Sequence, residues 1–128
     1  MAMTEFVFDA SAVIAFLQDE PGARQVQTSL SGGLLSAVNL AEIAQWIMDV
    51  RGEAAARLEL EGLPCEAVAF DQAQAQEAAA LRRTTRARGL SLGDRACLAL
   101  AKLRGLPVIT ADRAWATVDV GVEVVLIR

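Results

Sequence analysis

Short apolar runs alternate along this chain with longer stretches in which apolar residues recur every three to four positions. The runs are rich in Val, Ile and Phe, as in FVF near the start and VVLI near the end, which is typical of buried strands. The pattern predicts strands at Glu5–Asp9, Leu34–Ser36, Cys65–Phe70, Val108–Thr110 and Glu123–Ile127.

The stretches between these runs predict helices. From Leu40 to Val50 the apolar residues fall on one helical face. The stretch from Asp71 to Arg88 is rich in residues that favour helix, and Gly89 is a plausible end. Helices are predicted at Ser11–Leu17, Gly22–Leu30, Leu40–Val50, Glu53–Leu60, Asp71–Arg88 and Ser91–Arg104, with a short helical turn around Trp115.

Strands that alternate with helices predict an α/β fold with a parallel sheet and helices on both faces. The length of 128 residues fits a single domain, residues 1–128. No run approaches the roughly 20 apolar residues that span a bilayer, and the N-terminus does not resemble a signal peptide. A soluble cytoplasmic protein without a membrane segment is therefore expected.

Histidine is absent from the sequence, which limits the chemistry available to the protein. Ser-His-Asp and Cys-His catalysis are excluded, and so are imidazole metal sites. The two cysteines, Cys65 and Cys97, lack metal-ligand spacing and are interpreted as buried apolar residues. An enzyme built from this chain must use carboxylates, hydroxyls, arginines, Lys102 or a bound metal.

Four acidic residues, Asp9, Glu42, Asp94 and Asp112, are predicted to meet at one edge of the sheet. Ligands of parallel sheets collect beyond the carboxyl ends of the strands, and Asp9 and Asp112 follow two such ends. Glu42 and Asp94 lie in the first turns of helices that begin at the same edge. Two charges 4 Å apart repel by about 4 kcal/mol at an effective dielectric near 20. Oxygen ligands crowded in this way suit Mg²⁺ or Mn²⁺.

Each acid also has a purely structural explanation. Asn39 and Glu42 have the spacing of a capping box, as do Ser91 and Asp94. Turns are a common place for the other two acids, and for Ser11 and Thr110 as well. The joint placement of four acids favours a site, because helix capping does not require them to meet.

Four segments of the chain resemble, in order, the motifs of the PIN domain, and most closely those of the VapC toxins of bacterial VapBC toxin–antitoxin pairs. They are FDASAVIAFL with Asp9 and Ser11, SAVNLAEI with Asn39 and Glu42, LSLGDRACLALA with Asp94, and ITADRAW with Thr110 and Asp112. The resemblance covers nearly the whole chain, and four motifs in order are more specific than any one alone.

The resemblance implies a PIN-like three-layer α/β/α fold with a five-stranded parallel sheet, and hydrolysis of RNA phosphodiester bonds. It implies a Mg²⁺ or Mn²⁺ ion held by Asp9, Asp94 and Asp112, with Glu42 completing the catalytic set or binding a second ion. Ser11, Asn39 and Thr110 would orient these groups or a water. It also implies a homodimer and a VapB-type antitoxin partner that holds the enzyme inactive.

The net charge of −4 has the wrong sign for general binding to nucleic acid. A dense basic cluster could bind phosphates despite this net charge. A solvated helix face is the simpler interpretation of the cluster. This cluster consists of Arg82, Arg83, Arg86 and Arg88. Trp46 and Trp115 could stack on bases, but they are interpreted as core or interface residues.

Two other functions stay open at this point. A PIN-type nuclease with a housekeeping role in RNA processing would share every motif. A phospho-accepting receiver domain would share the length, the parallel sheet and the acidic pocket. Receivers need adjacent acids after the first strand, whereas Ala10 follows Asp9, and they need a lysine after the fifth strand, whereas Lys102 lies in a predicted helix.

Overall fold

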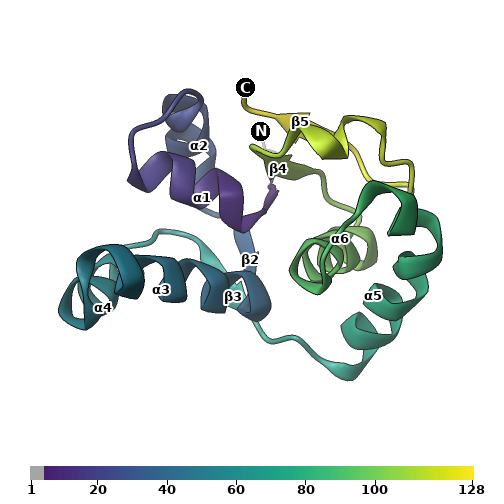
Figure 1. The fold of residues 1–128 in the computed structure, drawn as a ribbon, viewed down its shortest axis with the longest axis horizontal. Coiled ribbons are helices and arrows are strands. Elements are labelled where there is room, and N and C mark those ends of the chain that lie inside the picture. Colours follow the sequence, from purple (N-terminus) through teal and green to yellow (C-terminus); the bar gives the residue numbers. More distant parts are fainter. Residues whose placement is uncertain (1–4) are drawn as a thin grey trace.

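Five short strands lie side by side at the centre of the computed structural model, which describes residues 5–128 (Figure 1). They are β1 (Val7–Phe8), β2 (Leu34–Ser36), β3 (Glu66–Val68), β4 (Val108–Thr110) and β5 (Val124–Leu126). Neighbouring strands are parallel, and their order is β3-β2-β1-β4-β5. The predicted parallel sheet is confirmed, and each strand lies within its predicted range.

Six α-helices connect the strands within the described residues. They are α1 (Ala10–Leu17), α2 (Ala23–Leu30), α3 (Ala37–Arg51), α4 (Glu53–Glu61), α5 (Gln72–Thr85) and α6 (Leu92–Arg104). There are also two short 3-10 helices. Helix η1 (Arg86–Arg88) extends α5, and η2 (Arg113–Thr117) follows β4. No helix between residues 5 and 128 is long and apolar enough to cross a membrane.

An apolar core fills each face of the sheet, because successive strand residues point to opposite faces. Phe8 packs with buried residues of α1, α2, α3 and α4. Its neighbour Val7 packs on the other face with α5 and α6. Figure 1 shows the same division, with α1 to α4 on one side of the strands and α5 and α6 on the other. The three-layer α/β architecture is therefore confirmed.

The first turns of α3 and α6 lie together at the carboxyl edge of the sheet. Helix α3 begins at Ala37, directly after β2, and α6 ends at Arg104, shortly before β4. The side-chain amide of Asn39 in α3 donates to the backbone oxygen of Gly93 in α6 at 3.1 Å. This contact confirms that the two helices start at the same edge, as the topology predicted.

One predicted helix cap was wrong. The capping box at Asn39 and Glu42 does not form, because α3 begins earlier and Asn39 lies inside its first turn. The cap is Ser36, whose hydroxyl accepts from the backbone N–H of Val38 at 3.2 Å. Ser36 is also the last residue of β2, so strand and helix share this residue without a loop between them.

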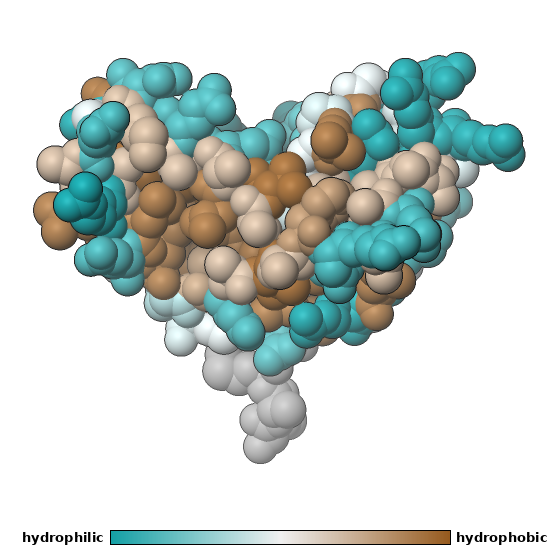
Figure 2. All heavy atoms as spheres, turned by 90° about the horizontal axis from the view of Figure 1, so that it is seen from below, coloured by the Kyte–Doolittle hydropathy of each residue, from teal (hydrophilic) through white to brown (hydrophobic). Residues whose placement is uncertain are grey.

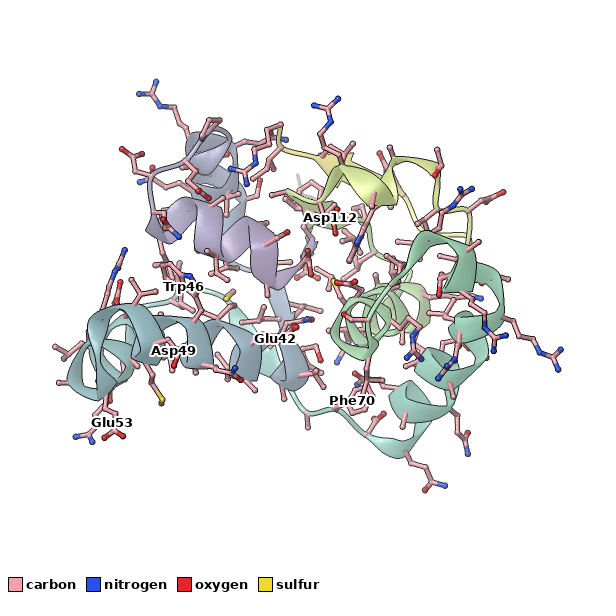
Figure 3. All side chains as sticks on the ribbon, in the orientation of Figure 1. Glu42, Trp46, Asp49, Glu53, Phe70 and Asp112 are labelled. Atoms are coloured by element: carbon pink, nitrogen blue, oxygen red, sulfur yellow. The ribbon has the colours of Figure 1, made fainter. Side chains whose placement is uncertain are left out.

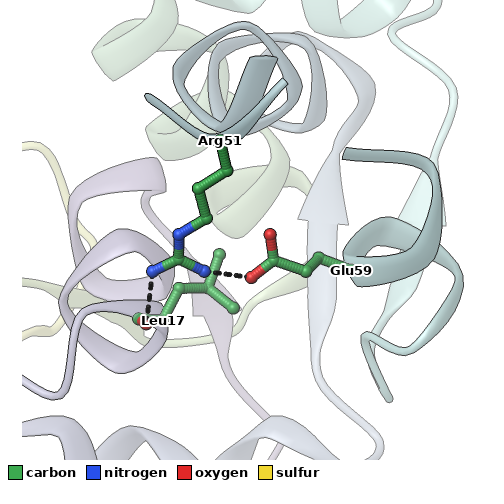
Figure 4. Close-up of polar contacts among 3 residues, drawn as sticks. All are labelled: Leu17, Arg51 and Glu59. Atoms are coloured by element: carbon green, nitrogen blue, oxygen red, sulfur yellow. Dashed lines mark hydrogen bonds and ion pairs between the residues drawn. The ribbon is translucent and has the colours of Figure 1, made fainter. Parts of the chain in front are cut away.

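The far end of α3 is held by Arg51. Its guanidinium donates to the backbone oxygen of Leu17 at 3.0 Å and forms an ion pair with Glu59 (Figure 4). The same group lies over the ring of Trp46, 5.4 Å from its centroid. One side chain therefore joins the ends of α1, α3 and α4, and the helix that carries Glu42 is fixed at both ends.

Candidate active site

Asp9 is a buried carboxylate at the end of β1, and only 3% of its surface is exposed. Its Oδ2 accepts hydrogen bonds from the Ser11 hydroxyl at 2.5 Å and from the Thr110 hydroxyl at 2.9 Å. The Ser11 hydroxyl in turn accepts from the N–H of Ala111 at 3.0 Å, and that of Thr110 accepts from the N–H of Asp112 at 3.0 Å. Each hydroxyl has one hydrogen to give, so these backbone donors direct both hydrogens at Asp9.

Burial raises the pKa of Asp9 from its ordinary value of 3.8 to about 6. The hydrogen bonds from Ser11 and Thr110 lower the pKa, while the nearby charges of Asp94 and Glu42 raise it further. Asp9 therefore holds its proton into the mildly acidic range unless a cation is present. The electrostatic contributions also place Asp9, Glu42 and Asp94 in one region of the molecule.

Cys97 lies beneath the same carboxylates. It is fully buried in α6, and burial raises the pKa of its thiol well above the usual range. The charges of Asp9, Asp94 and Glu42 raise this pKa further. The thiol stays protonated and forms part of the apolar floor of the site, which confirms its interpretation as a buried small residue.

Glu42 reaches from the exposed side of α3 toward α6 (Figure 3). Its Oε1 accepts a hydrogen bond from the Asn39 amide at 2.8 Å. The carboxylate lies so close to α6 that a Cβ on Gly93 would come within 2.5 Å of it. The sequence reasoning did not single out Gly93. A glycine in the first turn of a helix, where it costs stability, was the signal that could have identified it.

Asp94 forms the predicted capping box of α6. The backbone N–H of Ser91 donates to its Oδ2 at 2.9 Å, and the Ser91 hydroxyl accepts from the backbone N–H of Asp94 at 3.2 Å. The structural explanation of this residue is therefore confirmed. The cap uses one carboxylate oxygen, and the other accepts no hydrogen bond from residues 5–128. This second oxygen remains available to bind a cation.

Asp112 occupies a similar position at the start of η2. Its Oδ1 accepts from the backbone N–H of Ala114 at 2.9 Å, and its own N–H donates to Thr110. The Thr110 hydroxyl thus links Asp112 to Asp9. Figure 3 shows Asp112 on the opposite side of the site from Glu42.

The oxygen donors fit a divalent cation, although they do not form a finished cage. No three Asp, Glu or Cys side chains between residues 5 and 128 lie close enough to share an ion in this conformation. The donors that would hold Mg²⁺ are nevertheless present, and Asp94 and Asp112 each have an oxygen free of the caps. A buried carboxylate such as Asp9, whose pKa is raised by burial, is stabilised in its charged form when a cation binds to it.

The four arginines of the basic cluster are exposed along the end of α5 and η1. Arg88 donates to the backbone oxygen of Thr117 at 3.3 Å. None of the others, Arg82, Arg83 and Arg86, forms an ion pair within residues 5–128. The segment leads directly to Ser91, the cap of the helix that carries Asp94.

The two tryptophans differ in their environments. Trp115 is fully buried in the core shared with α5 and α6, so its interpretation as a core residue is confirmed. Trp46 is half-buried on α3 and lines an open groove of about 320 Å³ with Glu42, Gln45 and Asp49. Figure 3 shows Glu42, Trp46 and Asp49 of this groove along α3.

Comparison with known proteins agrees with this architecture. The sequence profile of the PIN domain matches residues 6–121. The chain belongs to the PIN domain family. Its strand order also differs from the 2-1-3-4-5 order of receiver domains, which sets aside that alternative. A search of curated protein sequences found no match.

Several solved structures share the fold of this PIN domain. A toxin–antitoxin complex from Klebsiella pneumoniae is 23% identical, with a TM-score of 0.75 and 98% of each chain covered. DNA-bound VapBC from Salmonella typhimurium is 18% identical, with a TM-score of 0.76 and coverage of 96% of this chain and 98% of that chain. Mycobacterium tuberculosis VapC20, described as a sarcin-ricin loop cleaving toxin, is 15% identical, with a TM-score of 0.69 and coverage of 93% and 98%.

Proposed function

We propose that this PIN domain is a Mg²⁺- or Mn²⁺-dependent endoribonuclease and the toxin of a type II toxin–antitoxin pair. The observation that carries the proposal is the buried Asp9, held by two hydroxyls beside Glu42 and Asp94 at the carboxyl edge of a PIN fold. Such a carboxylate is placed to bind a cation and is otherwise costly. The toxin–antitoxin proteins among the structural neighbours support the biological role.

The proposed roles of the residues follow from their surroundings. Asp9, Asp94 and Asp112 would hold the ion, with Glu42 completing the set. A divalent ion bound there supplies an activated water and stabilises charge on the scissile phosphate. Ser11 and Thr110 keep the Asp9 carboxylate oriented. The exposed arginines at the end of α5 would bind the phosphates of the RNA.

The same proposal includes a homodimer and a VapB-type antitoxin. Figure 2 shows apolar residues gathered between two more polar lobes of the molecule. A pocket of about 230 Å³ is lined by residues of β2, α3, α4 and β3 and the segment before β3: Leu35, Leu40, Leu60, Glu61, Leu63, Cys65 and Ala67. Met48, Val50 and Leu58 are also exposed on α3 and α4. Apolar surface of this kind suits a protein partner. Helix α2 does not add to this surface, because its large apolar residues Val26 and Leu30 are buried.

Cleavage of a structured RNA by the purified protein tests the activity. We expect cutting with Mg²⁺ or Mn²⁺, none in EDTA, and none from Asp9→Asn protein prepared in the same way. Activity that survives thorough chelation would contradict the metal mechanism. Co-expression with a small open reading frame, where one adjoins the gene, tests the toxin role. We expect the product of that frame to bind the protein and stop the cleavage, and a housekeeping nuclease would show neither effect.

A further inference from the structure

Asn39 is a fully buried amide between the two helices that carry Glu42 and Asp94. Its Nδ2 donates to Glu42 Oε1 at 2.8 Å on its own helix and to the backbone oxygen of Gly93 at 3.1 Å on α6. An amide nitrogen has two hydrogens, so both are engaged. Both partners are acceptors, which fixes the orientation of the amide, because a flip would set its oxygen against two other oxygens.

The carbonyl oxygen of this amide does not stabilise the fold. The Oδ1 of Asn39 is buried and has no hydrogen-bond partner among residues 5–128. An unpaired buried acceptor is destabilising, and a leucine of similar size would fill the space without that cost. A buried polar atom without a partner is expected where the residue contributes to a functional site.

Gly93 makes the contact possible from the side of α6. A Cβ at this position would lie 2.5 and 2.6 Å from the two carboxylate oxygens of Glu42. The carboxylate therefore occupies the space that a side chain at residue 93 would take. Asp94 is the next residue in the same turn, so one amide contacts both Glu42 and the turn that carries Asp94.

We propose that Asn39 is a positioning residue that sets the spacing between Glu42 and Asp94. This inference rests on the proposed function, which assigns both acids to the metal site. One hydrogen of the amide holds the Glu42 carboxylate, and the other holds the backbone beside Asp94. The Glu42 carboxylate and the first turn of α6 cannot move apart without breaking one of these hydrogen bonds. Repulsion between the two acids therefore does not separate the two helices before a cation binds.

A double-variant cycle tests this role, with Asn39→Leu, Glu42→Ala and the two combined. The readout is the dissociation constant of Mn²⁺, measured by titration calorimetry on the whole chain. We expect Asn39→Leu to weaken Mn²⁺ binding about 10- to 100-fold, as is usual when a group behind a metal ligand is lost. The same change in the Glu42→Ala protein should cost much less. Equal losses in both backgrounds, or no loss in either, would overturn the proposal.

A control variant separates positioning from packing. Gln74 is also a buried amide that donates to a backbone oxygen, that of Ala69, and its Oε1 is likewise unpaired. Its side-chain amide donates to no carboxylate among residues 5–128; only its backbone N–H does so, to Asp71. Gln74→Leu should change the melting temperature about as much as Asn39→Leu does and leave Mn²⁺ affinity unchanged. If Asn39→Leu does not fold, Asn39→Ala removes the donors without adding a charge and should show the same loss of affinity.

A measurement on the metal-free protein tests the geometry by itself. In the ¹⁵N spectrum both side-chain amide hydrogens of Asn39 should exchange slowly, and Glu42→Ala should release one of them. Exchange as fast as that of an exposed asparagine would contradict the inference, whatever the protein binds or cuts. Slow exchange in a protein that binds no Mn²⁺ and cuts no RNA would leave the contact standing and contradict the proposed function.

Discussion

At the scale of single residues, Asp9 combines burial with a precise set of donors. Its two hydroxyl partners come from opposite ends of the chain, Ser11 nearby and Thr110 at the end of β4. These donors favour the charged form, yet burial dominates and the pKa rises to about 6. The protonation of Asp9 therefore depends on pH in the mildly acidic range, and a bound metal would favour the charged form.

The stability of the metal-free protein should depend on the protonation of Asp9. Its pKa in the folded state lies above the ordinary value of 3.8, so the folded state binds the proton more tightly. This contribution is fully present below the unfolded pKa and is lost as pH rises through about 6. It amounts to about 3 kcal/mol. Urea unfolding from pH 4 to pH 7 in EDTA measures it, and Asp9→Asn should flatten the curve in this range. A variant that keeps the wild-type slope would assign the effect to another group.

Asp94→Asn separates helix capping from metal binding. Asparagine keeps an oxygen for the N–H of Ser91 and removes the charge, so the metal-free melting temperature should stay the same or rise. The wild type should gain about 2.7 kcal/mol at a Mg²⁺ concentration 100 times Kd, and the variant should gain little. Cleavage should be lost as well. Thermal melts with and without Mg²⁺ measure both effects, and a variant that cuts RNA at the wild-type rate would remove Asp94 from the site.

At the scale of elements, the sequence was most informative about order and type. The apolar spacing located every helix and strand, because each element buries a face against the sheet. The start of α3 was misplaced because Asn39 is a good cap by composition, while the actual cap, Ser36, also belongs to a strand. Periodicity cannot identify a residue that serves two elements.

The candidate site was also predictable only in part. Topology placed the first turns of α3 and α6 at one edge, and the contact between Asn39 and Gly93 agrees with this. Side-chain rotations are beyond such reasoning. The caps that engage Asp94 and Asp112, and the space that Gly93 leaves for Glu42, depend on local packing that one sequence does not encode in a simple pattern.

Replacement of the cap of α3 tests the corrected start of this helix. Ser36→Ala removes the acceptor for the N–H of Val38 and should lower the free energy of unfolding by about 1 kcal/mol. Ser31→Ala, an exposed residue after α2 whose side chain caps nothing, is the matched control and should change it by less than about 0.5 kcal/mol. Urea titrations at one pH compare the two. A loss of similar size in both variants would argue against Ser36 as the cap.

At the scale of the whole molecule, the proposed function requires an acidic protein to bind an acidic substrate. The net charge is −4, and the carboxylates of the site add to the problem locally. A bound divalent ion would reverse the sign of the charge at the site. The exposed arginines of α5 and η1 would supply phosphate contacts farther along the RNA. Contacts of this kind weaken steeply as the salt concentration rises.

The salt dependence of RNA binding tests the arginines. Arg82→Gln combined with Arg86→Gln should weaken binding and make the log–log salt slope shallower by about one unit for each lost phosphate contact. Arg24→Gln with Arg57→Gln is the matched control, because both residues are exposed on other helices and the change in net charge is the same. Filter binding from 50 to 300 mM salt measures the slopes. Equal slopes for the two double variants would make the cluster an ordinary solvated face.

The central position of β1 also has a consequence for the time at which the protein becomes active during synthesis. Strand β1 is made first, but its second neighbour, β4, lies about one hundred residues later, as does the hydroxyl of Thr110 that holds Asp9. A chain still growing on the ribosome therefore lacks one of the two strands that pair with β1, and one donor to Asp9, until almost all of it has been translated. Under the proposed function, the protein cannot cut the RNA around it before the chain is nearly complete.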